Sequence, residues 1–290
     1  SILSLNCETP TGETYVPDDN FEAFLELNGM GNGILNDDHV LTSNINEIEI
    51  LNVSSQNINE LIGIEDFSAL TYLDLSYNQI SNIDLSNNLV LEVLLCSNNE
   101  LNALDVSQNT ALTHFYCDTN QIETIDVSNN VLLEEFSCSY NELTNIAVFN
   151  NVDLTIFSCS HNQLLSLNVE LNPALTHLNC GFNQIGFLDM TQNNLLSSLK
   201  CENNQIFSLD IRNGNNAAMS NNLPDQFNVL NNPGLNCISV DNQVWSSENW
   251  SNVDPNVVFN NDCQNPETYI PDDNLEAYLE SNGMGNEVMN

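Results

Sequence analysis

The same pattern of polar and apolar residues repeats every 21 residues along much of this chain. The segment that begins at Leu112 reads LTHFYCDTNQIETIDVSNNVL, and its neighbours follow the consensus L-x-x-[LF]-x-C-x-x-N-x-[IL]-x-x-[IL]-[DN]-V-S-x-N-x-x. Apolar residues at alternating positions in the first half, such as Phe115 and Cys117, predict a β-strand. Seven successive segments match between about residues 70 and 211, after a degenerate segment over residues 50–64.

The two halves of each unit carry the same motif, L-x-x-L-x-C-x-x-N followed by I-x-x-I-x-V-x-x-N. One unit is too short to bury its own apolar face, so successive units must stack as coils into a continuous parallel sheet. About eight coils at ~4.8 Å per strand make a rod roughly 40 Å long. The repeat therefore predicts a solenoid built mainly of β-strands.

Two columns of asparagines end the two halves of each unit. Asn tolerates left-handed backbone, and its side-chain amide bonds to the backbone groups of turns. Stacked Asn side chains can satisfy the buried turn groups of neighbouring coils, so we interpret both columns as corner ladders. The first column is Asn78, Asn99, Asn120, Asn141, Asn162, Asn183 and Asn204, and the second is Asn88, Asn109, Asn130, Asn151, Asn172 and Asn193.

Six evenly spaced cysteines occupy one strand position that points into the predicted core. A disulfide framework or a zinc site uses clustered cysteines instead. Free Cys behaves in a core as a small hydrophobe, and the parallel Cβ vectors of in-register neighbours resist the torsion of a disulfide. We interpret the column as a ladder of buried thiols, with metal or redox chemistry as the alternative. It comprises Cys96, Cys117, Cys138, Cys159, Cys180 and Cys201.

These motifs resemble the leucine-rich repeat family, and more narrowly the short cysteine-ladder repeats of the internalin J type, which have the same length. The resemblance implies an α/β-type repeat fold that is mainly β, a right-handed leucine-rich repeat solenoid with its parallel sheet on the concave face and a short helical N-terminal cap. It also implies a bacterial cell-surface or secreted protein that serves in adhesion and binding. The flanks ETYVPDDNFEAFLELNGMGNG and NNPGLNCISVDNQVWSSENW look like the caps of such proteins in gliding, type IX-secreting bacteria.

A helix of about two turns is predicted ahead of the repeats, where it would cover the first coil. Acidic Asp18 and Asp19 begin this helix and Gly29 ends it. We interpret Asp18, Asp19 and Asn20 as helix-capping residues. Calcium is the alternative, but the cluster lacks the spacing of an EF-hand loop and no other motif supports Ca²⁺ as a cofactor. Residues 36–39, Asn-Asp-Asp-His, are interpreted as a polar loop.

The repeat register breaks after residue 211. An insertion of about residues 212–226 is expected to bulge as a loop on the convex side. Phe227 and Val229 then rejoin the pattern, and Val240 is expected to take the position of the cysteine ladder.

Two cysteines near the end of the repeats are expected to form a disulfide. Cys237 falls at a strand position that points outward, and Cys263 lies in the segment that follows. A Cys237–Cys263 bond would clip the last coil to its covering segment, as suits an exported domain.

The end of the chain repeats its beginning: ETYIPDDNLEAYLESNGMGNEVMN from Glu267 matches ETYVPDDNFEAFLELNGMGNGILN from Glu13. Cys7 and Cys263 stand just ahead of the two copies, so the chain looks like one period of a tandem array, and the partner of Cys7 stays open. The expected divisions are residues 1–12 for the end of a preceding module or linker, 13–49 for the helical N-terminal cap, 50–240 for the repeats, 241–263 for a C-terminal cap and 264–290 for the start of a second module.

The amino-acid composition of the chain excludes several classes of function. The chain has 40 acidic and two basic residues, a formal net charge of −38, and 54 asparagines. This balance excludes nucleic-acid binding, which needs basic side chains against phosphates, and it argues against docking on anionic membranes. No apolar run approaches the ~18 residues of a membrane span. The sequence has no G-x-S-x-G or H-E-x-x-H motif and too few basic residues for an oxyanion clamp, so we expect no catalysis.

The outward strand positions of the concave face are the candidate binding residues. A contiguous apolar patch marks a binding site, whereas strand-forming residues that only stabilise the sheet are the alternative. The expected partner is a surface protein or polysaccharide of a host or neighbouring cell, or an adjacent copy of the same module. The candidates are Tyr72, Tyr77, Val93, Leu95, His114, Tyr116, Tyr140, Ile156, His161, His177 and Phe182.

A column of aspartates occupies the opposite half of the coils. Stacked carboxylates repel one another, and bound cations would relieve the repulsion. A solvated Asp at a turn-forming position is the alternative. The column holds Asp84, Asp105, Asp126, Asp189 and Asp210, interrupted by Ala147 and Asn168.

Three functions stay open at this point. The first is an adhesion or binding module that uses the concave face, and the second is a structural unit of a stalk or filament. The third is ice or mineral binding, for which the columns carry Asn and Asp rather than flat rows of Thr.

Overall fold

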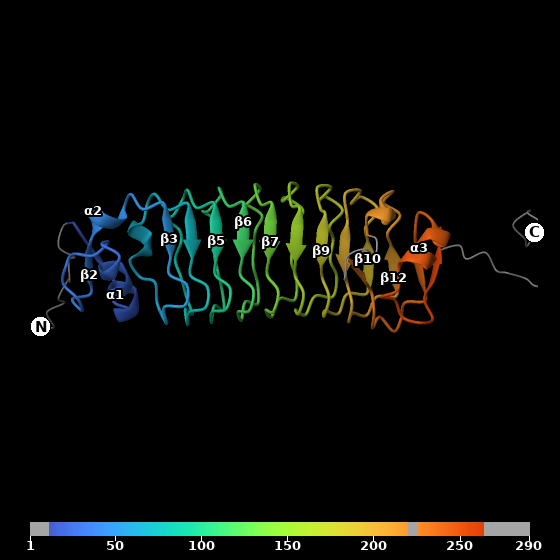
Figure 1. Cartoon of the computed structure of the whole chain (residues 1–290), viewed down its shortest axis with the longest axis horizontal. Coiled ribbons are helices and arrows are strands. Elements are labelled where there is room, and N and C mark those ends of the chain that lie inside the picture. The colour runs from blue at the N-terminus through green and yellow to red at the C-terminus, as the bar shows by residue number, and fades with distance from the viewer. Residues whose placement is uncertain (1–11, 220–225, 264–290) are drawn as a thin grey trace, which may run out of the picture.

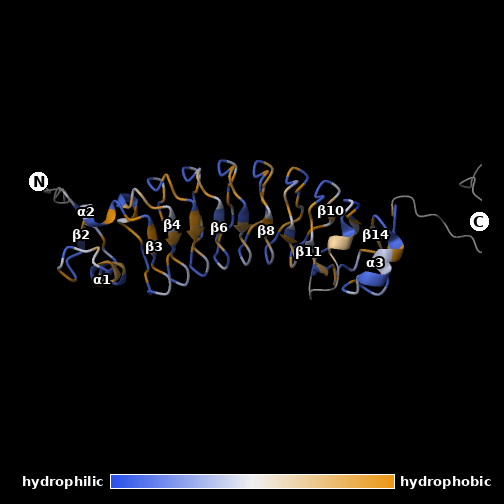
Figure 2. Ribbon diagram, turned by 45° about the horizontal axis from the view of Figure 1, so that its top comes forward, coloured by the Kyte–Doolittle hydropathy of each residue, from blue (hydrophilic) through white to orange (hydrophobic). Residues whose placement is uncertain are grey.

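The computed structural model describes residues 12–219 and 226–263. The coils stack side by side into an elongated rod that bows gently along its length (Figure 1; Figure 2). Nine strands of the described chain form one parallel sheet in the order β13-β11-β9-β8-β7-β6-β5-β4-β3. Their bounds are β3 (Ile50–Asn52), β4 (Tyr72–Asp74), β5 (Val93–Leu95), β6 (His114–Tyr116), β7 (Glu135–Ser137), β8 (Ile156–Ser158), β9 (His177–Asn179), β11 (Ser198–Lys200) and β13 (Phe227–Asn228). The predicted mainly-β solenoid is confirmed.

The regular coils pair in register because their constant length aligns equivalent positions. Leu94, Phe115 and Phe136 are neighbours across β5, β6 and β7. Each is the buried middle residue of a three-residue strand. The rings of Phe115, Phe136 and Phe157 stack inside the core with centroids 5.3 and 5.5 Å apart. Such aligned apolar columns form one continuous core along the rod.

A second, shorter parallel sheet forms on the other half of the C-terminal coils. It consists of β10 (Phe187–Asp189), β12 (Ser208–Asp210), β14 (Cys237–Ser239) and β15 (Val258–Asn260). The equivalent segments of earlier coils have no regular secondary structure, and short 3-10 helices occur at η1 (Ile64–Asp66) and η2 (Asn216–Ala218).

The expected register after the insertion is wrong by half a coil. Val240 follows β14, which pairs with β12, so Val240 takes the place of Ile211 in the second half. Val229 occupies the cysteine-ladder position, because β13 pairs with β11 and Asn228 lies opposite Lys200. The two halves share one motif, so the sequence pattern alone could not tell them apart. Residues 220–225 of the expected insertion lie outside the described residues.

The first asparagine ladder satisfies the corners of neighbouring coils completely. The Asn141 side-chain N–H groups donate to the carbonyl oxygens of Cys117 and Cys138 at 3.0 and 3.2 Å. Its Oδ1 accepts a hydrogen bond from the backbone N–H of Ile122 at 3.0 Å. Each such Asn therefore bonds to its own coil and to the preceding one, and Asn232 continues the ladder after the insertion.

The second ladder is bonded on one side only. The Asn130 side-chain amide donates to the carbonyl oxygens of Val106 and Asn109 at 3.0 and 2.9 Å. Its Oδ1 is buried and meets no donor within the described chain, and the same holds for the five other members of the column. The two ladders are thus alike in sequence, but they differ in the backbone groups that would lose a hydrogen-bond partner if the Asn were replaced.

The cysteine ladder lies in the core as predicted. All six thiols are free and buried, and Cys96, Cys117 and Cys138 donate weakly to carbonyl oxygens of the next strand at 3.3 to 3.6 Å. Burial raises the pKa of every ladder thiol. The thiols are therefore neutral packing groups at neutral pH.

The N-terminal end of the core is covered by β1 (Glu13–Tyr15), α1 (Asp19–Leu27), β2 (His39–Leu41) and α2 (Thr42–Ile45). Phe21 of α1 packs against Phe67 with ring centroids 6.3 Å apart. Asp18 accepts hydrogen bonds from the N–H groups of Asn20 and Phe21, and its other oxygen accepts from the N–H of Asn59 at 2.8 Å. Asp18 therefore caps α1, as expected, and also ties α1 to the first coil.

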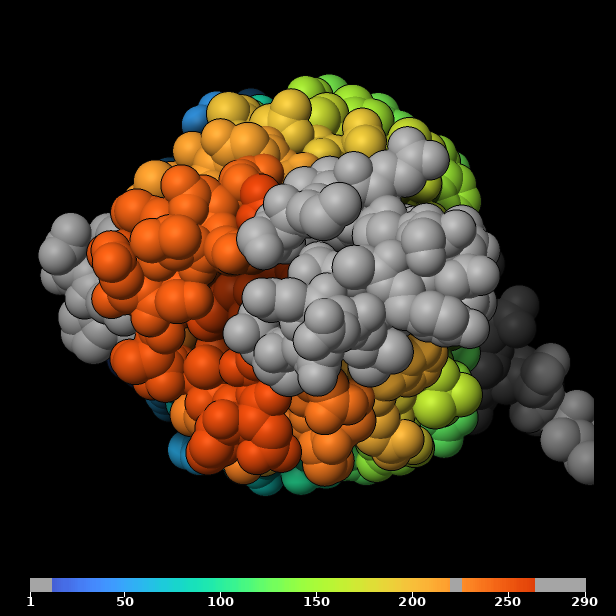
Figure 3. Space-filling view, turned by 90° about the vertical axis from the view of Figure 1, so that its right-hand side faces the viewer, coloured from blue at the N-terminus to red at the C-terminus, as the bar shows by residue number. Residues whose placement is uncertain are grey.

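The C-terminal end is covered by α3 (Gln243–Asn249) and the segment that leads to β15. The Trp250 ring stacks on Phe227 with centroids 4.0 Å apart. A disulfide joins Cys237 and Cys263, whose Cα atoms are 5.8 Å apart. Figure 3 shows the orange and red residues of this region at the end of the rod. Cys7 and the expected second module, residues 264–290, lie outside the described residues.

Substitution of Asn141 by Ala should destabilise the chain more than substitution of Asn130 by Ala. Both substitutions leave backbone carbonyl groups without a hydrogen-bond donor. Only Asn141→Ala also leaves a buried N–H, that of Ile122, without an acceptor. A buried donor left without a partner costs about 1–3 kcal/mol. Denaturant unfolding of the two variants measures the difference, and equal losses of stability would contradict the proposed asymmetry of the ladders.

The ladder thiols should resist a thiol reagent in the folded chain and react once it is unfolded. Because folding raises their pKa above the ordinary value of 9.0, their contribution to stability is complete below that pH and is lost as pH rises above it. We expect the thermal midpoint to fall above about pH 9. A Cys7→Ser variant removes the cysteine outside the described residues, and rapid labelling of this folded variant would overturn the expectation.

Candidate functional site

The outward side of the long sheet is the first part of the candidate site. Each strand buries its middle residue, so its first and third side chains point outward. On this face Tyr72 and Tyr116 are half-buried, and Ile156 is 37% exposed. The predicted residues that lie in these strands are Tyr72, Val93, Leu95, His114, Tyr116, Ile156 and His177.

Tyr77, Tyr140, His161 and Phe182 lie outside the strands, so their placement at outward strand positions is wrong. Each lies in the turn that leaves a strand, immediately before an Asn of the first ladder. Their backbone is left-handed, with φ of 60°, 55°, 54° and 56° in that order. Each corner needs one residue with left-handed backbone. The residue before the ladder Asn adopts this conformation, and not the ladder Asn itself, as we had expected from the sequence.

Three of these turn residues form a stack at the surface, which we call the aromatic corner stack: Tyr140, His161 and Phe182. The Tyr140 and His161 ring centroids are 3.9 Å apart, and those of His161 and Phe182 are 4.0 Å apart. Interplanar angles of 14° and 15° make the rings nearly parallel. Tyr140 remains 53% exposed and Phe182 42% exposed. The ring faces contact each other, so the ring edges meet solvent.

The stack occupies corners that suit a smaller residue. Left-handed backbone costs roughly 1–2 kcal/mol for an ordinary side chain, and Asn adopts it more readily. Asn98, Asn203 and Asn231 take this conformation at equivalent corners. Burial lowers the pKa of His161, which keeps its ring neutral at neutral pH. Three successive uncharged rings therefore occupy corners at which Asn would adopt the left-handed backbone with less strain.

An acidic, hydrogen-bonded group lies beside the stack on the sheet face. The Tyr116 hydroxyl donates to the Glu135 carboxylate of the next coil, and His114 Nε2 lies 3.8 Å from that carboxylate. Burial, reinforced by the bond to Glu135, raises the pKa of Tyr116. Ser137 donates to Asp118 one coil away. These contacts hold the polar side chains of the face in place.

The aspartate column of the opposite half consists of turn acceptors. Asp126 accepts a hydrogen bond from the backbone N–H of Ser128 at 2.8 Å. Bonds of this kind to Ser side chains and backbone lower the pKa of Asp84, Asp105 and Asp126. Asn168 fills the same position and accepts from the N–H of Glu170 at 2.9 Å. An uncharged side chain makes the same bond, which supports the turn-forming alternative over a cation ladder.

The N-terminal cap holds the one group of three metal-ligating side chains found among the described residues. Asp19, Glu22 and Asp38 each place a carboxylate oxygen within 4.8 Å of the other two. Asp18 and Asn20, which we had considered with Asp19 from the sequence, do not belong to it. Burial raises the pKa of Glu22.

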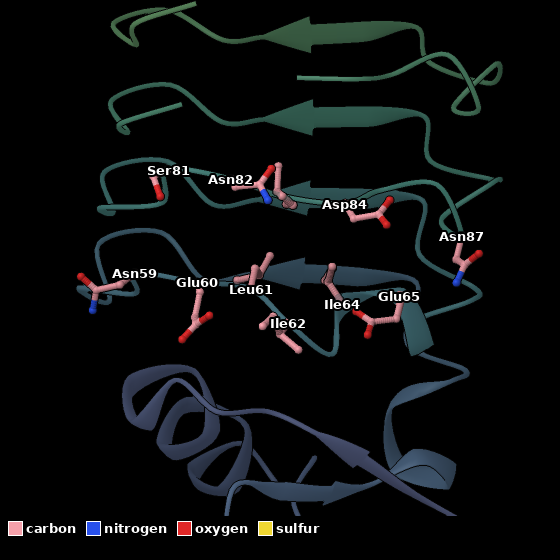
Figure 4. Close-up of a pocket in the computed structure, with 11 residues that line it drawn as sticks. Asn59, Glu60, Leu61, Ile62, Ile64, Glu65, Ser81, Asn82, Asp84 and Asn87 are labelled. Atoms are coloured by element: carbon pink, nitrogen blue, oxygen red, sulfur yellow. The ribbon is translucent and has the colours of Figure 1, made fainter. Parts of the chain in front are cut away.

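A shallow hollow of about 400 Å³ opens over the second halves of the first two coils (Figure 4). Leu61 and Ile62 line it from one coil, and Asn82 and Asp84 line it from the next. Its lining mixes apolar and polar groups, and Asp84 is bonded to the N–H of Ser86. Glu60 and Glu65 also line the hollow. No helix in the described part of the chain is both long and apolar enough to span a bilayer.

Comparison with solved structures finds the functional domain of internalin J from Listeria monocytogenes, which includes a cysteine ladder. It is 27% identical with a TM-score of 0.53, and the match covers 80% of this chain and 58% of that one. The chain shares the leucine-rich repeat fold and carries a cysteine ladder of its own. Internalin C2 of the same organism matches at 20% identity and a TM-score of 0.57, over 88% of this chain and 100% of that chain.

A leucine-rich repeat protein of Leptospira interrogans also shares the fold, at 17% identity and a TM-score of 0.57, over 76% of this chain and 62% of that one. The leucine-rich repeat chain thus spans less than two thirds of the internalin J and Leptospira chains. No protein-family model matches it, and no curated protein matches its sequence.

Sequence reasoning missed several members of the candidate site in this leucine-rich repeat chain. Glu135 and Asp118 were not singled out, although Glu135 stands one repeat after the predicted His114 and so occupies the same column. Glu22 was not singled out because its partner Asp38 is distant in sequence and is brought close only by the turn before β2. Glu135 could have been found from the repeat period, which places it in the same column as His114. No sequence signal marks the contact of Glu22 with Asp38.

Proposed function

We propose that this leucine-rich repeat chain is a non-enzymatic binding module that holds a partner protein against the long sheet and the aromatic corner stack. The observation that carries the proposal is the stack, in which the exposed rings of Tyr140 and Phe182 enclose the half-buried ring of His161 in successive coils, at corners that suit Asn. Strained backbone persists at functional sites more than elsewhere. Exposed aromatic residues also contribute much of the binding energy at protein interfaces.

The geometry of the stack favours a protein partner over a polysaccharide. The faces of the His161 ring are covered by Tyr140 and Phe182. Ring edges suit apolar and aromatic side chains, which pack edge to face. A polysaccharide, the alternative ligand, would lie flat on open ring faces, which this stack offers only at its two ends.

Charge on the same face defines the chemistry of the partner. Asp118 accepts a hydrogen bond from the backbone N–H of Ser139, the residue before Tyr140. Glu135 begins the strand that leads to this corner, and Glu202 lies in the coil that follows Phe182. Lys200 is the single lysine of the whole chain. Complementary potentials steer partners together and select among them. The proposed partner therefore carries a basic surface around an apolar anchor.

We place the module outside the cell, where it would serve in adhesion. The Cys237–Cys263 disulfide supports this setting, because disulfides persist in oxidising compartments. The dense negative charge is also tolerable where salt screens it.

Replacement of Tyr140 and Phe182 by Asn should weaken partner binding by about 30-fold or more, as expected for interface anchors. Asn is the residue at equivalent corners, so the thermal midpoint should hold or rise. Partners are first selected with the natural chain on an array of surface-protein ectodomains and glycans. Their dissociation constants are then compared between the natural chain and the double variant.

Tyr77→Asn is the matched control, because Tyr77 is 64% exposed at an equivalent corner but belongs to no stack. The control should bind like the natural chain. If the double variant retains full affinity for every partner, the stack is not the binding site. If the hits are all glycans, the chain does not bind proteins as proposed.

A second candidate function is a structural unit in a tandem stalk or filament, supported by the second copy of the cap sequence that begins at Glu267. If this second copy docks on another coil end, the chain should associate as its concentration rises. Sedimentation of the natural chain and of a variant truncated after Cys263 measures this, with association expected only for the natural chain. Two monomers would argue against the stalk.

A further inference from the structure

Three carboxylates converge at the N-terminal cap, outside the proposed binding face. Asp19 and Glu22 are three residues apart on α1 and so share one face of the helix. Asp38 comes from the turn before β2, which has left-handed backbone at Asn36 and Asp38. One oxygen from each of Asp19, Glu22 and Asp38 lies within 4.8 Å of the other two.

Glu22 distinguishes this group from an ordinary acidic surface. Its side chain is fully buried at 0% exposure. Oε1 accepts a hydrogen bond from the backbone N–H of Asp37 at 3.2 Å, but Oε2 is buried and meets no donor. Glu22 also contacts the Asp37 carboxyl group and the backbone of Asp38. A buried carboxylate with other carboxyl groups beside it is costly unless a proton, a cationic side chain or a metal ion offsets its charge.

No basic side chain is available to pair with this group. Lys200 and Arg212 are the only lysine and arginine in the chain. Arg212 lies in the C-terminal coils, where it contacts Asp210 and Asp262. His39 follows Asp38, and its Nδ1 lies 2.7 Å from the backbone oxygen of Asp37. The negative charge of the cap carboxylates therefore has no counterpart among the described side chains around it.

We propose that the cap binds one calcium ion through the carboxylates of Asp19, Glu22 and Asp38. A site made only of oxygen atoms selects hard divalent cations. Ca²⁺ accepts varied and flexible arrangements of carboxylate, carbonyl and water ligands, whereas Mg²⁺ demands near-ideal octahedral geometry. Asp19 is exposed, so water and ions can reach its carboxylate.

The internal repeat of the cap carries both of the ligands that lie on the helix. Asp273 and Glu276 correspond to Asp19 and Glu22, while the apolar neighbours Phe21 and Phe24 are replaced by Leu275 and Tyr278. A buried helix position that packs only against apolar groups would be filled by an apolar residue. Retention of Glu at this position in both copies fits a ligand.

The bound ion would tie the start of α1 to the turn before β2. These two segments cover the first coil, so the ion would stabilise the N-terminal end of the core. Calcium would then act on the stability of the cap and leave the binding face unchanged.

Calorimetric titration of the chelator-treated chain with Ca²⁺ at neutral pH and physiological ionic strength tests the proposal. We expect saturable binding, and a rise of about 5 °C in the midpoint of cap unfolding when the ion is in large excess over its dissociation constant. Glu22→Gln and Asp38→Asn should each weaken binding at least about tenfold, since ligand charge sets calcium affinity. Asp19→Asn changes an exposed residue and serves if Glu22→Gln fails to fold.

Asp105→Asn is the matched control, because it removes the same charge at a turn where Asn168 already makes the equivalent bond. It should retain the natural affinity and the rise in midpoint. Unchanged calcium binding in Glu22→Gln and Asp38→Asn, or no binding to the natural chain at millimolar Ca²⁺, would overturn the proposal. An equal response to Mg²⁺ would overturn the assignment of calcium. A Glu22→Gln variant that is more stable than the natural chain, with no response to Ca²⁺, would show that Glu22 is held by a proton instead.

Discussion

Hydrogen bonds from one coil to the corner of the next are the interaction on which this structure depends. Each short coil bends sharply at its corners, where its buried backbone groups find no partners in the same coil. The side chains of the first Asn ladder supply the missing donors and acceptors, as Asn141 does for Cys117 and Ile122. Each coil therefore completes its neighbour, and no coil is stable alone.

This constraint decides which positions are free to vary. The middle strand residue, the thiol and the ladder Asn all point inward, where their volume and hydrogen bonds are fixed. The residue before the ladder Asn must adopt left-handed backbone, but its side chain points into solvent. Its identity therefore changes from Tyr to Asn to Thr along the rod, and an aromatic ring here is compatible with the frame without being required by it. The candidate site lies where the frame permits variation.

The repeat explains why much of the fold could be predicted from the sequence. A constant period fixes which side chains share a column, so the cysteine ladder and both Asn ladders followed from spacing alone. The register after residue 211 could not be predicted, because the two halves of a coil present the same motif and differ only in the sheet they join. Tyr140 and Phe182 were predicted to lie in strands because the alternation of polar and apolar side chains continues from the strand into the turn. The backbone conformation changes at the turn, but the sequence pattern does not. The contact between Glu22 and Asp38 joins two segments of no shared period, so spacing carried no information about it.

The scarcity of basic side chains has a consequence for how long such a chain would survive among secreted proteases. Trypsin-like enzymes cut after Lys or Arg, and they need an exposed, flexible segment to do so. Lys200 lies in a strand that is paired on both sides. Arg212 is held by the carboxylate of Asp210 and by the backbone oxygen of Asn261. The described rod thus offers these enzymes almost no place to cut, and its one lysine amine marks a single point on the sheet face for chemical attachment.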